Sequence, residues 1–322
     1  MPREDDRDSG RGRRHQYIQK RWCQTVTALR EEYPHESVAT LCGLFGKKRQ
    51  WYYANMKADV SERQRVKLLA DMIGYYRLCC PRIGGFKLFH LLEKNLGHAV
   101  TLGRDSFLKV YESKGFKLNP NKRRRTTDSN HVYKRYPNLI KGKDARYSNH
   151  IWVSDITYVW ILGDVLYLHL VTDAYSHAVL GWCLSDSLSA SHTTEALRMA
   201  IRIAGGGNLC GTIHHSDRGS QYASEAYVSC LMEHHIRISM TEGYEPTDNA
   251  MAERQNGIFK VEWIYEQEMY RDKEQAINEI NRMIDFYNNR RPHMSIGMEC
   301  PMEVYKANCR GKIFGEKDPD SF

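Results

Sequence analysis

Hydrophobic residues follow two different periods in the two halves of this chain. Up to about residue 117 they recur at helical spacing, as at Val38, Leu41 and Cys42. From His150 onward, short segments rich in Val, Ile, Tyr and Trp follow one another closely, which favours strands. The pattern therefore predicts an all-helical N-terminal part followed by a domain that mixes strands and helices.

The helical part is expected to contain two helical pairs. A helix over Tyr17–Tyr33 precedes a segment in which Gly43 and Gly46 can turn the chain, and a basic, aromatic helix follows from Lys47. This order is typical of a helix-turn-helix, although any small helical hairpin has a similar pattern. Apolar positions 86–92 and 107–111 predict a second pair with a turn at Gly97. That pair is either a second helix-turn-helix or a helical linker domain that only packs.

The second half has the element order βββ-α-β-α-β-α, with a further helix at its end. Short gaps join the first three strands, which indicates antiparallel neighbours. The order predicts an α/β fold: a mixed five-stranded sheet with helices on both faces, the ribonuclease-H-like layout, in which the first and fourth strands are adjacent. The expected strands are Ile151–Ile161, Val165–Thr172, Ala178–Leu184, Gly211–His215 and Ile236–Met240, and the expected helices are Ala190–Ala204, Ala223–His234, Ala250–Tyr270 and Lys273–Asn289.

These patterns divide the chain into six segments. We expect a disordered tail at 1–15, a helix-turn-helix domain at 16–57 and a second helical domain at 58–120. A basic linker at 121–147, the ribonuclease-H-like core at 148–310 and a C-terminal tail at 311–322 are expected to follow.

Charge is distributed unevenly between the halves. Residues 1–145 contain 31 Lys and Arg against 15 Asp and Glu, whereas the remaining residues contain 16 against 24. A basic first half attracts polyanions such as nucleic acid, although ordinary solvated surface charge is the alternative. No apolar run approaches ~18 residues, so no membrane span is expected. The N-terminus is too charged for a signal peptide, and nine cysteines without a CxxC pair suit reduced thiols, so we expect a cytoplasmic protein.

Three carboxylates are candidates for catalysis. Asp155 lies inside an apolar strand, where an unpaired charge is costly. Asp217 ends the fourth strand and Glu253 begins a helix. Taken singly, Asp155 could be a strand-edge residue, Asp217 a turn former and Glu253 a charge at a helix N-terminus. Together they form a set of hard oxygen ligands suited to Mg²⁺ or Mn²⁺, and two such ions can activate a hydroxyl and stabilise the leaving oxygen at a phosphodiester.

Polar residues near the carboxylates are expected to support them. Glu253, Asn256 and Lys260 share a helix face, so Lys260 either touches a DNA phosphate or base or is a surface lysine. His215 and Gln221 are expected near the site, with His215 either moving a proton or only making hydrogen bonds. On the same helix an apolar stripe is expected at Met251, Ile258, Val261 and Tyr265.

Several motifs make a resemblance specific. These motifs are Trp152–Tyr158, His214–Tyr222, Asn249–Glu253, Lys260, Tyr287–His293 and Pro301. On these motifs, residues 150–305 resemble the integrase core of bacterial insertion-sequence transposases of the orfB type, which carry a DDE catalytic set and belong to the retroviral-integrase-like superfamily. The resemblance implies transposition of the chain's own element by strand cleavage and joining at the element's ends.

The resemblance also bears on cofactors and partners. Double-stranded DNA, as terminal inverted repeats and target, is the expected partner. Retroviral integrases carry a zinc site of paired His followed by CxxC, which this chain lacks, so no zinc is expected. Asn249 and His293 are expected to support the site, while Arg291 and His293 could either contact DNA or hold the last helix. Expected DNA contacts are Lys47, Lys48, Arg49, Arg123, Arg124, Arg125, Asn256, Lys260 and Arg291.

Three questions stay open from the sequence. The chain could be a nuclease or resolvase that only cuts, or a domesticated DNA-binding protein with an inert core. Many relatives join an upstream coiled-coil frame by frameshifting, and no long heptad run precedes Tyr17 here. A single core offers one carboxylate set while transposition must hold two element ends, so a homo-oligomer on DNA is expected.

Overall fold

The computed structural model describes residues 22–96, 102–118, 136–242, 250–264 and 269–309, without the side chains of 250–253 and 255. The chain divides into two compact units, residues 1–72 and 73–322. The two tails, the residues around Arg123 and the expected turn at Gly97 lie outside the described residues. None of the helices in the described ranges is long and apolar enough to cross a membrane.

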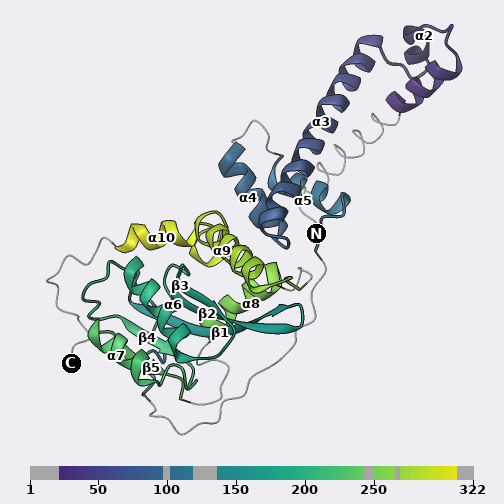
Figure 1. The fold of residues 1–322 in the computed structure, drawn as a ribbon. Coiled ribbons are helices and arrows are strands. Elements are labelled where there is room, and N and C mark those ends of the chain that lie inside the picture. The colour runs from purple at the N-terminus through teal and green to yellow at the C-terminus, as the bar shows by residue number, and fades with distance from the viewer. Residues whose placement is uncertain (1–21, 97–101, 119–135, 243–249, 265–268, 310–322) are drawn as a thin grey trace. The chain divides into compact units, whose positions relative to one another are not determined.

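The described part of the first unit, residues 22–72, contains three helical segments. A helix over 22–32 is followed by α2 (Val38–Gly43) and the first part of α3 (Arg49–Cys79) (Figure 1). The Ser37 side chain caps α2 by accepting a hydrogen bond from the backbone of Thr40. A small core of Trp22, Cys23, Val26, Leu41, Cys42 and Tyr52 holds the segments together. The helical order matches the expectation, and α3 runs without a break across both the expected boundary at 57/58 and the division at 72/73.

The second unit begins with a helical segment. It comprises the end of α3, α4 (Gly85–Leu96) and α5 (Arg104–Ser113). The rings of Phe89 and Phe107 lie 5.6 Å apart, and Arg77 donates a 2.8 Å hydrogen bond to the Tyr111 hydroxyl. The two packed helices expected here are therefore confirmed.

A five-stranded sheet forms the centre of the second unit. The strands β1 (Ile151–Ile161), β2 (Asp164–Asp173) and β3 (Val179–Ser185) are antiparallel, and β4 (Ile213–Ser216) and β5 (Arg237–Met240) continue the sheet in parallel with β1 (Figure 1). The strand order is β3-β2-β1-β4-β5. This confirms the ribonuclease-H-like layout and places the first and fourth strands side by side.

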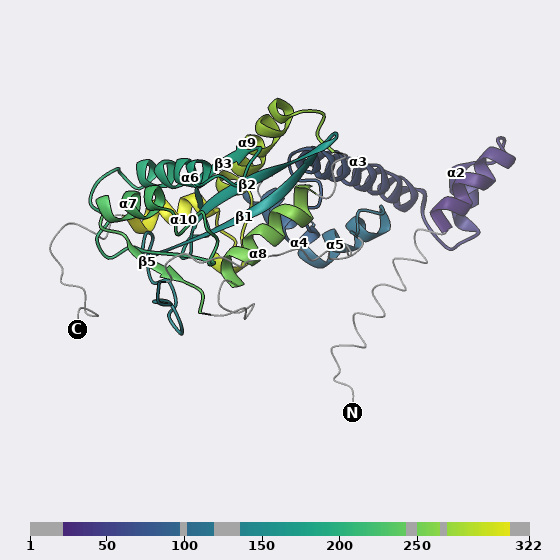
Figure 2. The ribbon, with the colours of Figure 1, turned by 60° about the horizontal axis from the view of Figure 1, so that its bottom comes forward.

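Helices lie on both faces of the sheet. On one face, α6 (Ala190–Ile203) and α7 (Glu225–Glu233) bury a core that includes Trp152, Leu180 and Leu197. Because successive strand residues point to opposite faces, Asp155 points away from the Trp152 face, toward α8 (Ala250–Phe259). Figure 2 shows α6 and α8 on different sides of β1.

The chain after α8 departs from the expected single helix. A π-helical turn, η1 (Lys260–Ile264), follows α8, and α9 (Lys273–Asn289) begins after a break. Of the expected apolar stripe, Val261 is wrong, because it is 38% exposed, whereas the rings of Phe259 and Trp263 are buried. The larger rings fill the space beside α9, where Phe259 packs 4.8 Å from Tyr287. Ile258 is half-buried, and the side chains of Met251 and Tyr265 lie outside the description. The structure also adds η2 (Met294–Ile296) and α10 (Pro301–Asn308), which the sequence pattern did not predict.

Candidate active site

The two aspartates lie at neighbouring positions of adjacent strands. Ser154 of β1 pairs with Ser216 of β4 in parallel register, and Asp155 and Asp217 each follow by one residue. Neighbouring strands are about 4.8 Å apart, and parallel register puts the two carboxylates on one face. The structure thus brings together two residues that are 62 positions apart in the sequence.

Asp155 is held in a fixed orientation. Its Oδ1 accepts a 2.8 Å hydrogen bond from the Ile156 backbone, and its Oδ2 accepts one of 2.6 Å from Asn256 Nδ2. Burial, together with the negative charge of Asp217, raises the pKa of Asp155 to about 7, although both hydrogen bonds and the Lys260 charge oppose the rise. Asp155 and Asp217 are both half-buried and repel each other, and a bound cation would relieve that repulsion.

The loop after β4 is shaped around Asp217. The backbone of Gly219 donates a 2.9 Å hydrogen bond to Asp217 Oδ1. A Cβ atom at residue 219 would lie 2.8 Å from Gln221 Oε1 and 3.0 Å from Asp217 Oδ1. Any larger residue at 219 would therefore displace the Gln221 side chain from its place beside Asp217. Gln221 therefore lies beside the carboxylate, as expected.

The helix α8 brings a third group to the aspartates. Asn256 is 3% exposed, and its amide is directed at Asp155, so its assignment to the DNA contacts is corrected: the side chain is engaged inside the protein. Asn256 Oδ1 is buried without a hydrogen-bond partner among the described residues. Glu253 lies one helical turn earlier on α8, and its side chain is outside the description. Lys260 follows α8, half-buried and near enough to Asp155 to favour its charged form.

The paired histidines of β4 face opposite sides of the sheet. His215 is fully buried, and its Nδ1 lies 2.8 Å from the Ser239 hydroxyl. This favours the hydrogen-bonding alternative over proton transfer. His214 Nε2 lies 2.7 Å from the Ser154 hydroxyl and 2.8 Å from the Tyr227 hydroxyl. Both histidines therefore tie the strand that carries Asp217 to its neighbours.

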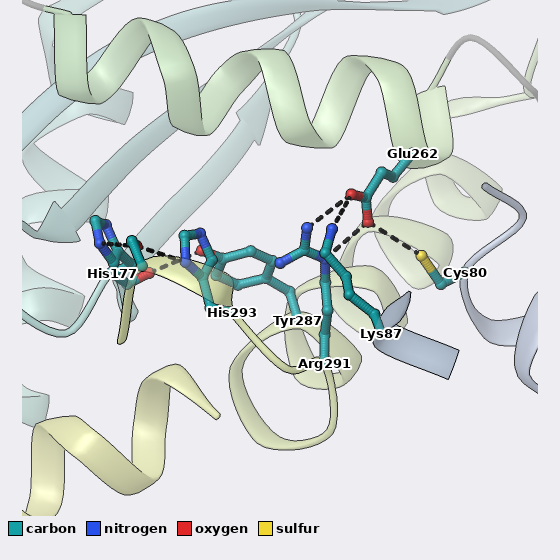
Figure 3. Close-up of polar contacts among 8 residues, drawn as sticks. Cys80, Lys87, His177, Glu262, Tyr287, Arg291 and His293 are labelled. Carbon is teal, nitrogen blue, oxygen red and sulfur yellow. Dashed lines mark hydrogen bonds and ion pairs between the residues drawn. The ribbon is translucent and has the colours of Figure 1, made fainter. Parts of the chain in front are cut away.

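Arg291 and His293 hold the end of α9 rather than DNA. Arg291 is 1% exposed, and its Nε and Nη2 each donate a 2.7 Å hydrogen bond to Glu262 (Figure 3). The assignment of Arg291 to DNA is corrected on this ground. His293 is buried, stacks on His177 at 4.5 Å and contacts the Ser295 hydroxyl at 2.8 Å. Burial, with His177 and Arg291 nearby, lowers the pKa of His293 to about 3, which keeps it neutral.

The other candidate DNA contacts are partly described. Lys48 and Arg49 are exposed at the start of α3, and the Lys47 ammonium lies 4.8 Å from the centre of the Trp51 ring. Asn249 and the arginines 123–125 lie outside the described residues. The first unit therefore presents cations on one helix start, which is compatible with the expected DNA contact.

Other acidic and metal-binding side chains lie apart from this site. Asp173 is buried, but it accepts hydrogen bonds from Asn149 and Ser176 and so holds a turn. Cys183, His192 and Glu195 bring their ligand atoms within 4.8 Å of one another in the searched, described part of the chain. That cluster is on the α6 side of the sheet, and the expectation of no zinc stays a prediction.

Sequence reasoning missed Glu262. It was not singled out from the sequence, because nothing in the local pattern marks the π turn that directs its side chain inward. The motif that contains Arg291 was the available signal, because a buried arginine requires an acidic partner.

Comparisons with known proteins agree on the family. Two models described as "Integrase core domain" match residues 145–246 and 234–301. The protein assigned as transposase to insertion sequence element IS986/IS6110 of Mycobacterium tuberculosis is 34% identical over 190 residues, which are 58% of this chain and 68% of that protein. The 31 kDa protein of insertion element IS600 of Shigella sonnei is 30% identical over 268 residues, covering 81% of this chain and 96% of that protein.

A further relative and a solved structure complete the comparison. Transposase InsF for insertion sequence IS3A of Escherichia coli is 34% identical over 161 residues, covering 50% of this chain and 55% of that protein. The integrase catalytic core of HTLV-2 aligns with a TM-score of 0.38 at 21% identity, over 49% of this chain and 97% of that one. Two of these relatives are at least 30% identical and are covered over more than two thirds of their length, so this chain belongs to the insertion-sequence transposases and is a DNA transposase with an integrase core.

Proposed function

We propose that Asp155, Asp217 and Glu253 form the catalytic carboxylate set of this transposase and hold two Mg²⁺ or Mn²⁺ ions. The observation that carries the proposal is the adjacency of Asp155 on β1 and Asp217 directly after β4, with α8 joined to Asp155 through Asn256. Glu253 lies on that same helix, one turn before Asn256. The proposed set therefore draws on β1, the loop after β4 and α8.

The side chains present suit a hard divalent cation. The donors are carboxylate oxygens, which Mg²⁺ and Mn²⁺ prefer. Asn256 Oδ1, buried beside Asp155 without a partner among the described residues, would be satisfied by an ion or its bound water. When bound, two such ions would activate the attacking hydroxyl and neutralise charge on the leaving oxygen.

The protein itself supplies orientation and charge. Hydrogen bonds from Ile156 and Asn256 fix both oxygens of Asp155, and Gly219 fixes one oxygen of Asp217. Pre-oriented groups lower the barrier because they need not reorganise during the reaction. Lys260, close to Asp155, contacts a DNA phosphate or base next to the scissile bond in this proposal.

The substrate we propose is the double-stranded DNA at the ends of the chain's own insertion sequence, together with a target duplex. In cleavage and in joining, an oxygen–phosphorus bond forms from the attacking hydroxyl while the bond to the leaving oxygen breaks. The exposed Lys48 and Arg49 of the first unit, with the basic residues 122–125, supply phosphate contacts. Two chains or more pair the two ends.

The test replaces each carboxylate by its amide. Asp155→Asn, Asp217→Asn and Glu253→Gln are each expected to lower cleavage and joining by about a hundredfold or more. DNA affinity should change little, because the charge is lost away from the basic N-terminal unit. Asp164→Asn, an exposed aspartate at the start of β2, is the matched control and should stay active. Strand joining at normal rate in Mg²⁺ by any of the three amide variants would refute this site.

The same assay separates the alternative that the chain only cuts. A labelled duplex that carries the end of the element, with a free 3′ hydroxyl, should become joined to a target plasmid. Cut product without joined product would identify a nuclease or resolvase instead.

A further inference from the structure

A buried carboxylate lies just beyond the proposed catalytic helix. Glu262 is in η1, two residues after Lys260, and its side chain is 12% exposed. Its oxygens accept hydrogen bonds from Arg291 Nε and Nη2, each at 2.7 Å, and from Lys87 Nζ at 2.8 Å (Figure 3). Burial alone would raise the pKa of Glu262, but the hydrogen bonds and charge of Arg291, with those of Lys87, bring it down to about 2. The carboxylate is therefore ionised, and one negative charge is shared between two cations.

The two cations come from different parts of the chain. Arg291 follows α9 and belongs to the core. Lys87 lies on α4, in the helical segment that precedes the core in sequence. Glu262 thus joins the helical segment to the core.

Backbone contacts reinforce the same junction. The Arg82 backbone donates to the Glu262 carbonyl at 3.2 Å, and Trp263 Nε1 donates to the Cys79 carbonyl at 2.7 Å. The Cys80 thiol lies 3.5 Å from Glu262 Oε2. Residues 79–87 therefore converge on two consecutive residues of η1.

The opposite end of this helical stretch reaches the aspartates. Asn256 bonds to Asp155, and six residues later Glu262 bonds to Lys87. Glu253 and Asn256 of α8 thus lie on a helix whose far end is fixed by the preceding segment. π turns inside helices are frequent at functional sites, and here the turn directs Glu262 to its partners.

We propose that Lys87 is a positioning residue: its ion pair with Glu262 makes the orientation of the helix that bears Glu253 and Asn256 depend on the docking of residues 79–96. This proposal rests on the proposed function of those residues. Lys87 is better suited to the role than Arg291, because Glu262 keeps its bidentate partner when Lys87 is lost. Loss of Arg291 would leave a carboxylate buried with one cation, which destabilises the fold itself.

The experiment compares Lys87→Met with Lys94→Met in the full-length protein. Both lysines are on α4, but Lys94 is exposed and pairs with the surface residues Glu299 and Glu303. We expect hydrogen exchange of amides 250–264 to rise at least about tenfold in Lys87→Met only, with β1 and β4 unchanged. On a plasmid that carries the gene with its native flanking DNA, cleavage at saturating DNA should fall by about tenfold to a hundredfold. The Mg²⁺ concentration needed for half-maximal rate should rise, while the affinity for DNA stays the same.

Each result bears on the proposal. Unchanged exchange at 250–264, or a cleavage defect equal to that of Lys94→Met, would overturn it. If Lys87→Met unfolds, Lys87→Gln, which can still donate a hydrogen bond, replaces it; if both unfold, the role is structural and the proposal fails. Failure of the proposed function is a separate result. It would appear as normal cleavage and joining by Asp155→Asn, whatever the hydrogen exchange of Lys87→Met shows.

Discussion

Asp173 and Asp155, two aspartates of the same sheet, show how surroundings decide a residue's role. Asp173 has its oxygens occupied by the backbone of Asn149 and by the backbone and hydroxyl of Ser176, so it stabilises a turn. Asp155 has fewer donors and a second carboxylate, Asp217, next to it. The hydrogen bonds to Asp173 satisfy its carboxylate without a ligand, whereas a bound cation would stabilise the charged form of Asp155.

Asn256 is the residue whose substitution separates two roles. Asn256→Ala removes the donor that orients Asp155 Oδ2, so cleavage at saturating DNA should fall by about tenfold to a hundredfold. The dissociation constant for DNA should change little, because the side chain is buried. Arg254→Ala, an exposed neighbour on α8, is the control for loss of a DNA contact and should weaken binding instead. A purely affinity-based defect in Asn256→Ala would restore the original assignment of Asn256 to DNA.

At the scale of elements, strong periodicity made most of the core predictable. The helix Lys273–Asn289 and the strand β1 were both predicted with correct ends. In each of them the spacing of apolar and polar positions and the flanking turn residues indicate the same boundaries. The adjacency of Asp155 and Asp217 followed from element order alone. The bounds of the elements depend on the local sequence pattern. The adjacency of the strands follows because only a few topologies suit this order of elements.

Features set by tertiary contacts were not predictable. In the π turn at 260–264, Glu262 and Trp263 bind residues 79–87 and 291, which are distant in sequence. The burial of Asn256 and Arg291 also depends on contacts with residues distant in sequence. These two polar side chains were therefore assigned to DNA from the sequence, whereas in the structure they bind other protein groups. The length of α3 was missed because its mixed surface gives no continuous apolar stripe.

The packing of α6 on β3 gives a prediction at this scale. A Cβ atom at residue 181 would lie 1.9 Å from the carbonyl oxygen of Ala196, so Gly181→Ala must move the helix away from the sheet. We expect a loss of about 1–3 kcal/mol in the free energy of unfolding, measured by urea denaturation. Gly207→Ala, where nothing lies within 4 Å of the new atom, is the control and should be close to neutral. Equal stability of the two variants would show that α6 does not lie this close.

For the whole molecule, buried histidines predict how stability depends on pH. Burial lowers the pKa of His169 to about 4, and burial with the neighbouring His215 lowers that of His214 to about 3, against 6.5 for a free histidine. Below about pH 6.5 the unfolded chain binds protons that the folded chain does not, so stability falls as pH falls toward the folded pKa values. Each histidine should cost on the order of 2 kcal/mol at about pH 5 relative to about pH 8.

A pair of variants isolates this effect. His169→Gln should make the urea midpoint less sensitive to pH, because one buried titrating group is removed. His35→Gln, at an exposed position, should leave the pH dependence as it is in the natural chain. The same slope in both variants would mean that His169 is not held neutral by burial.

The oligomer prediction belongs to the whole molecule and is shaped by the contacts of residues 79–87. A core without its first 145 residues would lose Lys87 and the backbone partners of Glu262 and Trp263, so a truncated chain is a poor reagent. Two full-length proteins avoid this: one carries Asp217→Asn, and the other has Lys47, Lys48 and Arg49 each replaced by alanine. Alone, the first should bind DNA without joining it, and the second should bind weakly.

Mixed together, the two proteins should recover joining well above the sum of their separate activities. The reason is that one chain can bind an end while the intact core of another acts on it, which requires at least two chains per pair of ends. Omission of either protein is the control. No recovery would show that each chain acts on the end that it binds. Light scattering that finds one protein for each synapsed pair of ends would contradict the oligomer itself.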